Sequence, residues 1–560
     1  MTSDPGAPGA AASAPGAAAG AGSPGRGPLS PTPLEWACLA AGVALLLRYA
    51  WLMDDAFVYF RYVDNLVWLG AGLVYNRGEY VEGFSSPLWA LLLSALRELD
   101  LPWWMIVRGL GVASFLACGA LLIAAHRRLS PRGAPVLNLP LLFVSLAYGP
   151  LCYFTSGLET PFVQVAAPLF ALRLLGPAPL ALDVAVALSP LLRHELALPL
   201  GLYGLFLWAR DGRFPWRLFA LSAVFTGAWL AFRIYYYADL FPNTFYLKNM
   251  ADVPQGLIYL WNTVEAYALH LWLGLHAALW VWLRRRRADV PYALERAAMI
   301  AVSLAVTVWV VRIGGDPRHY RFLAFPVLLV LCALGGIAEQ AVAQLPAARR
   351  RVAWAAGVLV FGGSMAAAYP EQLREHPFAL REDARMVHLI KDAAEHRRMP
   401  QLTPPAFSAG GEIEQTDAYR RREGRAVEYD GIYLQSGCVY LYRAWDRYAL
   451  HVLGLTDAIL ARTEMEADRP AHKLGLIPLA DDMAPILRAA HGRPHRGIYR
   501  AAVEAGTAAP WIAANLDSIE TIERKIYNRH DWGENLGLAL TFPTPIRIEG
   551  EPAKGPDDAP

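Results

Sequence analysis

Two adjacent carboxylates, Asp54 and Asp55, stand directly after the first long apolar run of the sequence, 35–53. Carboxylates at a lipid boundary are costly unless they are paired or used for chemistry. One interpretation is that an acid of this pair takes a proton from a reacting hydroxyl group. The alternative is a solvated acidic helix start, which the helix dipole favours. The spacing alone leaves both interpretations open.

A turn motif and a charged triplet follow later apolar runs. In SGLET, 156–160, Glu159 is either a site acid or a cap of the next helix. The triplet Arg193, His194 and Glu195 falls at a predicted turn. Its arginine and glutamate can pair with each other, and a lone histidine is more often structural than catalytic. Each of these candidates therefore keeps a structural alternative.

The segment RIYYYADLFPNTFYLKN, 233–249, places a lysine beside an aromatic cluster. Its three tyrosines are typical of a membrane interface, and Pro242 and Asn243 interrupt any helix. Lys248 then lies in an apolar stretch. It is either a lysine that snorkels along apolar surface or a cation held ready for a phosphate group.

The segment RIGGDPRHYRFLAFP, 312–326, gathers basic side chains around a Gly-Gly turn. These side chains are Arg312, Arg318, His319 and Arg321. Guanidinium groups bind phosphate oxygens through paired hydrogen bonds, so an anionic headgroup is the predicted partner. Pairing between an arginine and Asp316 is the alternative.

The elements that must position these residues are predicted to be membrane helices. The chain is 55% hydrophobic and 18% charged, whereas soluble domains are about 25% charged. A helix crosses a bilayer with about 20 mostly apolar residues, and backbone in lipid must be hydrogen-bonded internally. About eleven runs of this kind are predicted: 35–53, 104–125, 139–155, 160–176, 178–192, 194–209, 216–236, 258–283, 294–311, 321–345 and 352–368.

The short run 87–99 decides which side of the membrane each loop occupies. If it does not cross, the most basic loops all lie in the cytoplasm, as the positive-inside rule requires; they are 126–132, 210–217, 284–287 and 347–352. We therefore predict that 87–99 lies at the outer interface or re-enters from it. All the candidate residues then converge on the outer face of the plasma or inner membrane.

The domain organisation follows from these runs. We predict a disordered cytoplasmic segment at 1–33, a transmembrane domain at 34–368, an extracytoplasmic α/β domain at 369–548 and a disordered tail at 549–560. Within the outer loop 54–99, helical spacing of apolar residues predicts an amphipathic helix on the interface over 54–69.

Charge and cysteine usage exclude other classes. The net charge of +2 gives no basic surface for nucleic acid. The five cysteines form no metal-type cluster, so small buried residues are predicted and no metal ligands are assigned. Carboxylates and cations together beside lipid favour transfer of a group from a lipid-linked phosphate. A carboxylate would activate the acceptor hydroxyl, and cations would stabilise the departing phosphate.

The motifs also resemble a known family. DDAFVYFRYVDNLV, GLVYN, GEYVEGFSSPLW, SGLET, PNTFYLK and GGDPRHYRFLAFP occur in the order seen in the mycobacterial terminal beta-(1->2)-arabinofuranosyltransferase (AftB) family, whose members are membrane glycosyltransferases of the GT-C fold. The resemblance covers roughly 35–345 and extends loosely to GLTD, 454–457. RHE at 193–195 departs from the family pattern, so sugar selectivity can differ.

The resemblance implies a polyprenyl-phosphate sugar donor, in the nearest relatives decaprenyl-phosphoryl-arabinofuranose, and a glycan or glycolipid acceptor. It implies that the acid pair is catalytic, with Asp54 favoured over Asp55. Lys248, Arg318 and Arg321 match basic motif positions, and His319 joins them as a candidate phosphate contact. Arg61, Glu82 and Asn243 complete the candidate set.

Several points stay open at this stage. They are the sugar, the acceptor, the anomeric outcome and any need for a divalent cation. A transporter or flippase of a lipid-linked sugar is the main alternative, although the sequence shows no internal repeat of the kind common in transporters. A glycan-binding scaffold acting through 369–560 is another.

Overall fold

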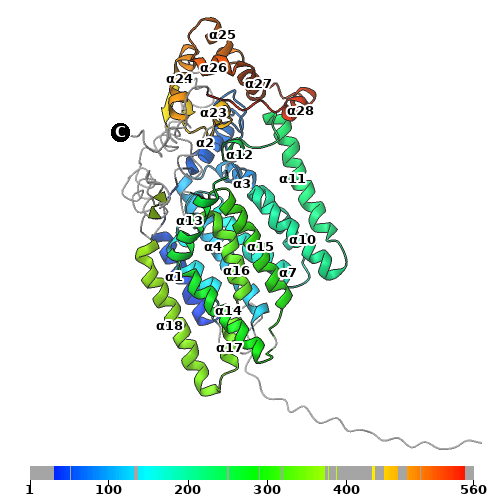
Figure 1. The fold of residues 1–560 in the computed structure, drawn as a ribbon, viewed down its shortest axis with the longest axis vertical. Coiled ribbons are helices and arrows are strands. Elements are labelled where there is room, and N and C mark those ends of the chain that lie inside the picture. The colour runs from blue at the N-terminus through cyan, green and yellow to red at the C-terminus, as the bar shows by residue number, and fades with distance from the viewer. Residues whose placement is uncertain are drawn as a thin grey trace, which may run out of the picture.

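The computed structural model shows a bundle of helices stacked along one long axis, with the C-terminal helices covering its upper end (Figure 1). The structure describes residues 31–48, 50, 52–53, 55–130, 137–248, 251–288, 290–316, 320–372, 376–377, 386–387, 432–435, 447–464, 476–491 and 493–548. Asp54, Arg318 and His319 lie outside these described residues, as do nearly all of 1–33 and the tail 549–560.

The first half of the bundle is built from short and long helices. They are α1 Pro33–Arg48, α2 Ala56–Val67, α3 Pro87–Arg97, α4 Trp103–Leu129, α5 Leu139–Leu146, α6 Tyr148–Phe154, α7 Thr160–Leu174, α8 Leu180–Ala187, α9 Ser189–Leu192, the 3-10 helix η1 His194–Leu196 and α10 Ala197–Asp211. The second half comprises α11 Trp216–Tyr237, α12 Asn243–Lys248, α13 Val253–Ala266, α14 Leu269–Arg285, α15 Ala293–Arg312, the 3-10 helix η2 Arg321–Leu323, α16 Ala324–Leu334, α17 Ile337–Ala343 and α18 Ala347–Gln372.

Every apolar run predicted to cross the membrane folds as helix. Four helical segments in the described part of the chain are long and apolar enough to span a bilayer, namely α4, α11, α15 and Arg321–Ala343. A fifth is possible if α13 and α14, which meet at a bend of 75°, form one broken span. The bundle thus fits a membrane protein. The count of about eleven crossings stays a prediction for the shorter helices.

The basic ends of several helices meet at the lower end of the bundle, opposite the C-terminal helices. Arg210 Nη1 at the end of α10 lies 3.2 Å from Glu295 Oε1 at the start of α15. Arg296 donates to the Leu129 carbonyl at the end of α4 over 3.0 Å. Segments predicted to be cytoplasmic therefore come together at one end, and the orientation of that end across the membrane stays a prediction.

The helix α2 corrects one expectation. Its ten residues from Ala56 to Asn65 are all buried, so it does not lie half-exposed on the membrane interface. Arg447, just before β4 of the C-terminal part, lies against it, because Arg61 donates to the Arg447 carbonyl over 2.9 Å. Periodicity predicted the helix correctly but could not show that distant residues would cover its polar side.

The helix α3 corresponds to the run 87–99, which determines the predicted side of the membrane for every later loop. It has 11 residues, about 16 Å at 1.5 Å per residue, which is too short for a hydrocarbon core about 30 Å thick. Ser86 caps its first turn by accepting from the Trp89 amide, and Pro87 suits that position. Arg97 near its end forms a fully buried ion pair with Asp64 of α2 over 2.9 Å.

The C-terminal part has its own hydrophobic core. Its elements are β1 His376–Pro377, β2 Met386–Val387, β3 Ile432–Gln435, β4 Tyr448–His451, α23 Ala458–Ala461, α24 Leu476–Ala489, α25 Ile498–Glu504, α26 Pro510–Ala514, α27 Leu516–Ile526 and α28 Trp532–Leu540. β1 and β2 pair antiparallel, and β3 and β4 pair parallel. Val81 of the loop 54–99 and Leu247 of α12 join this core. The predicted boundary at 369 falls inside α18.

A buried carboxyl group joins the two parts. Glu79 accepts hydrogen bonds from the hydroxyl groups of Tyr448 and Tyr527, each at 2.8 Å, and from the Asn76 amide at 3.2 Å. Burial raises the pKa of Glu79 to about 7, although the hydrogen bonds act in the opposite direction. The loop 54–99 is therefore fixed to the C-terminal part through a group that titrates near neutral pH.

Asp64→Leu is expected to lower the free energy of unfolding by about 3–5 kcal/mol, because the buried Arg97 guanidinium loses the carboxylate of its ion pair. Thermal unfolding can be followed with a thiol-reactive dye, since four cysteines are buried as predicted, namely Cys38, Cys118, Cys152 and Cys332. Cys438 lies outside the described residues. The exposed neighbour Glu98 provides the control Glu98→Gln, and equal melting temperatures for the two variants would contradict the role of the pair.

Glu79 also predicts a pH dependence. Its pKa is about 7 in the fold and about 4.5 unfolded, so its contribution to stability is complete below pH 4.5 and declines as pH rises to 7. The loss amounts to about 3 kcal/mol. The melting temperature of the wild type minus that of Glu79→Gln should therefore decrease as the pH is raised from 5 to 8. A constant difference over this range would exclude the raised pKa.

Candidate active site

A pocket of about 480 Å³ lies at the upper end of the bundle, where segments far apart in sequence meet. Its lining includes charged residues of the triplet at 193–195, the end of α12, the end of α15 and the start of η2. The lining residues are Ser85, Arg193, His194, Glu195, Leu198, Thr244, Phe245, Lys248, Trp309, Arg312, Ile313, Arg321 and Phe322. The structure therefore brings together three of the motifs that the sequence singled out.

Two glycines allow these segments to approach. Gly157 of SGLET has φ +81°, and a Cβ there would come within 2.7 Å of the Ala56 Cβ at the start of α2. Gly315 has φ +75°, and its Cβ would overlap the Tyr259 ring of α13. Since L side chains rarely adopt this backbone conformation, both turns depend on glycine. Asp55 adjoins Ala56 and Asp316 adjoins Gly315, and both carboxylates lie beside Arg321.

Arg321 forms ion pairs with both of these carboxylates. Its Nη1 atom lies 3.2 Å from Asp316 Oδ2 and 3.6 Å from Asp55 Oδ2. The arginine and Asp316 are buried, whereas the Asp55 side chain is one-third exposed. The Nε atom of Arg321 is buried and has no hydrogen-bond partner among the described residues. The alternative of an Asp316–arginine pair is thus present in the structure. The Nε atom of Arg321 remains as a hydrogen-bond donor beside it.

Two cations on the pocket wall have no carboxylate partner in the described part of the chain. Lys248 is the last residue of α12, and burial lowers its pKa while Asp55 opposes that effect. Arg312 ends α15, where a cation is favoured by the helix dipole. Neither side chain has an ion pair or a hydrogen bond among the residues described. A phosphate group would supply the missing negative charge.

The pocket wall is apolar as well as cationic. Leu198, Phe245, Trp309, Ile313 and Phe322 contribute to it, and Leu198 is 39% exposed on α10. A binding site with both kinds of wall suits an amphiphile whose charged group is attached to a hydrocarbon chain. The arrangement therefore favours a lipid phosphate over a free sugar phosphate.

The triplet at 193–195 both pairs internally and lines the pocket. Arg193 Nη1 lies 3.1 Å from Glu159 Oε1, and its Nε atom pairs with Glu195. Its guanidinium also lies 4.3 Å from the Phe322 ring centre. His194 is half-exposed toward the pocket and 3.9 Å from Glu195. Glu159 thus orients Arg193, a role that neither sequence alternative described.

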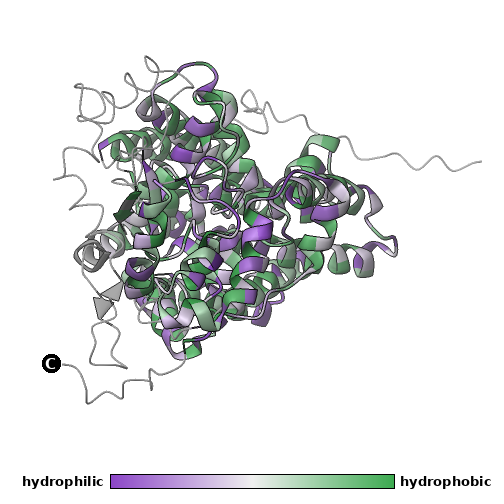
Figure 2. Ribbon diagram, turned by 90° about the horizontal axis from the view of Figure 1, so that it is seen from above, coloured by the Kyte–Doolittle hydropathy of each residue, from purple (hydrophilic) through white to green (hydrophobic). Residues whose placement is uncertain are grey.

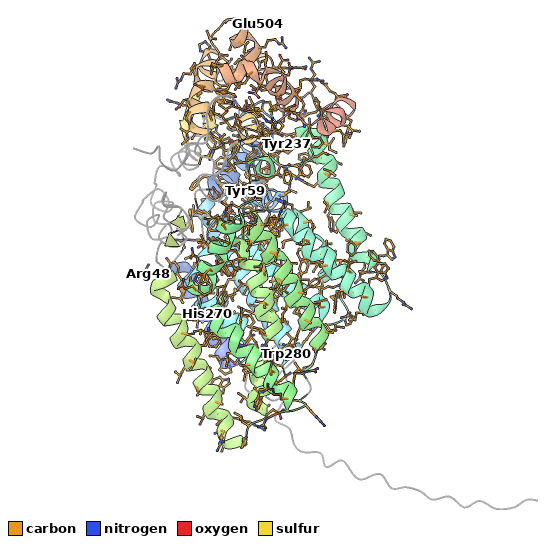
Figure 3. The ribbon with its side chains drawn as sticks, viewed as in Figure 1. Arg48, Tyr59, Tyr237, His270, Trp280 and Glu504 are labelled. Atoms are coloured by element: carbon orange, nitrogen blue, oxygen red, sulfur yellow. The ribbon has the colours of Figure 1, made fainter. Side chains whose placement is uncertain are left out.

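Three other candidates lie away from the pocket wall. Arg61 donates to the Tyr75 carbonyl over 2.9 Å, and Glu82 pairs with Arg233 of α11. Asn243 donates to three carbonyls of the segment GLTD, those of Gly454 at 3.0 Å and of Leu455 and Asp457 at 3.1 Å. These contacts attach the loop 54–99 to α11 and α12 to the C-terminal part. Figure 3 labels Tyr59 of α2 and Tyr237 of α11 in the upper half of the molecule, below the C-terminal helices.

Arg312 belongs to the basic segment for which an anionic headgroup was predicted, but the family resemblance did not include it among the phosphate contacts. Thr244 and Ser85 also line the pocket and were not predicted. The sequence does place Arg312 near the site, because a basic residue that ends a long apolar run lies at the same end of the bundle as the turn that follows it. The described residues contain no group of three or more His, Cys, Asp or Glu side chains that could hold a metal ion.

Comparisons with known proteins identify similar chains. The sequence is 28% identical over 332 residues to a terminal beta-(1->2)-arabinofuranosyltransferase of Corynebacterium glutamicum, covering 50% of this chain and 47% of that protein. It is 29% identical over 329 residues to the protein of the same name from Mycobacterium tuberculosis, covering 51% and 52%. These matches confirm the resemblance seen in the motifs. The chain spans about half the length of these curated relatives.

No family model and no solved structure matches the chain.

Lys248→Gln and Arg312→Gln should each weaken binding of farnesyl phosphate by about tenfold, since a hydrogen bond to a charged group contributes about 1.5 kcal/mol. Calorimetric titration of the purified protein would measure this. Arg284→Gln, at the exposed end of α14, is the matched control. Equal affinities for all three variants would show that the phosphate binds elsewhere.

Proposed function

We propose that the protein is a glycosyltransferase of the GT-C class, which moves arabinofuranose from a polyprenyl-phosphate donor to a glycan hydroxyl group at the outer face of the cell membrane. The observation that carries this proposal is the pocket whose wall combines Lys248, Arg312 and Arg321, with Asp55 3.6 Å from Arg321. The names of the two similar proteins support the sugar and the reaction type.

The donor fits the pocket by charge and by shape. Its phosphate would meet Lys248, Arg312 and the unpartnered Nε atom of Arg321, and its polyprenyl chain would leave along the apolar wall at Leu198 and Trp309. Cations placed where charge develops stabilise a departing phosphate. The phosphate is the leaving group because the bond between its oxygen and the sugar C1 breaks.

We assign different roles to the two acids of the pair. A new bond forms between the acceptor oxygen and C1, and the acceptor proton passes to a carboxylate, for which we favour Asp54. Asp55, beside Arg321, would hold the guanidinium toward the phosphate. If the product keeps the donor configuration, a nucleophile or a front-face route replaces this single displacement.

The decisive experiment incubates the purified protein with synthetic farnesyl-phosphoryl-arabinofuranose and an arabinofuranoside acceptor, with product analysis by mass spectrometry. Transfer of one pentose is expected. Hexose donors test the sugar preference. Movement of the lipid-linked sugar across vesicles without transfer would instead support a transporter.

Asp54→Asn should lower the transfer rate by about 100-fold or more, the usual size of a general-base contribution, while donor binding and the melting temperature stay unchanged. Asp211→Asn makes the same change at the lower end of α10 and serves as the control. It should retain full activity. Full activity of Asp54→Asn would show that Asp54 does not act in the reaction.

A further inference from the structure

The helix α28 carries an apolar surface that the protein does not cover. Trp532, Leu536 and Leu540 are 51%, 46% and 59% exposed, and Phe542 just beyond the helix is 59% exposed. The three helix residues are four apart and therefore share one face. Contiguous apolar surface of this kind marks a partner or a membrane.

The position of α28 is fixed by the end of a membrane helix. Asn535 of α28 donates to the Tyr235 carbonyl over 2.7 Å, and Asn528 donates to the Tyr236 carbonyl over 3.1 Å. These carbonyls belong to the last turn of α11, where a helix leaves its acceptors unsatisfied. The side chains of two asparagines thus cap α11, and Figure 1 shows α28 beside the upper end of α11.

Aromatic stacking reinforces this attachment. The His530 ring stacks on Tyr236 with centres 4.9 Å apart and meets Tyr80 edge-on at 4.3 Å. Trp532 lies 5.5 Å from Tyr235. The segment that leads into α28 therefore builds an aromatic cluster around the end of α11.

The end of α11 marks a membrane surface. α11 has 22 residues, about 33 Å long, which matches a hydrocarbon core of about 30 Å. Only 17% of its apolar window is buried in the protein, so most of its surface is available to lipid. Trp216 at one end is 73% exposed, and Trp532 with Tyr235 is at the other. Aromatic residues at both ends are typical of the two interfaces.

We propose that α28 is an interfacial membrane helix, which inserts Trp532, Leu536 and Leu540 into the bilayer surface at the C-terminal end of α11 and so anchors the C-terminal part to the lipid. The helix packs against α11, most of whose apolar window is not buried in the protein. Glu534 is two residues from Leu536, hence about 160° away around the helix, and is exposed on the opposite side. The helix thus has one face for lipid and one for water.

Figure 2 views the protein from this end, so the C-terminal helices lie nearest the viewer. The anchor is independent of the proposed transfer reaction. It would hold the C-terminal part at a constant height above the pocket.

Nitroxide labelling of the full chain in phosphatidylcholine–phosphatidylglycerol nanodiscs tests the proposal. Leu536→Cys and Leu540→Cys are compared with Glu534→Cys in a Cys438→Ser background, since the other four cysteines are buried. Power-saturation measurements should give a severalfold higher ratio of oxygen to nickel-chelate accessibility at 536 and 540 than at 534.

Equal ratios at all three positions would place both faces in water and overturn the proposal. Low accessibility of 536 and 540 to both reagents would also overturn it, because a protein partner would then cover the face. The melting temperature of each labelled variant verifies that the fold is retained.

Discussion

A buried arginine needs carboxylates around it, because an unpaired charge in an apolar bundle costs several kcal/mol. Arg321 meets this requirement with Asp316 on its own segment and with Asp55 at the start of α2. The two contacts draw the turn before α16 and the acidic start of α2 to one point. Because they leave the Nε atom without a partner among the described residues, the same arginine can both hold the site together and bind an anion.

The remaining site residues are arranged around this centre by contacts of the same type. Glu159 orients Arg193 beneath the Phe322 ring, and the glycine at 157 lets the SGLET turn reach α2. Asn243 binds the backbone of the segment GLTD, so the C-terminal part is held beside the helix that carries Lys248. The pocket is therefore formed by the helices of the bundle and its loops, and the C-terminal part is attached beside it through Asn243.

Much of the helical bundle could be predicted from the sequence, since long apolar runs in lipid have few alternatives to helix. The convergence of 193–195, Lys248 and Arg321 could also be predicted, because the basic loops fixed which polar segments share an end. The burial of α2 could not, since its cover comes from residues almost 400 positions later. Arg61, Glu82 and Asn243 were singled out by residue type, but their roles depend on backbone carbonyls and a partner arginine that no local pattern reveals.

The central claim is that the cations of the pocket wall form a binding site for a lipid phosphate. A structure of the protein determined with farnesyl phosphate in nanodiscs tests it most directly. The account predicts phosphate density within hydrogen-bonding distance of Lys248, Arg312 and Arg321, with the isoprenoid chain against Leu198 and Trp309. Phosphate density among the arginines at 284–287, at the opposite end of the bundle, with an empty pocket would contradict it.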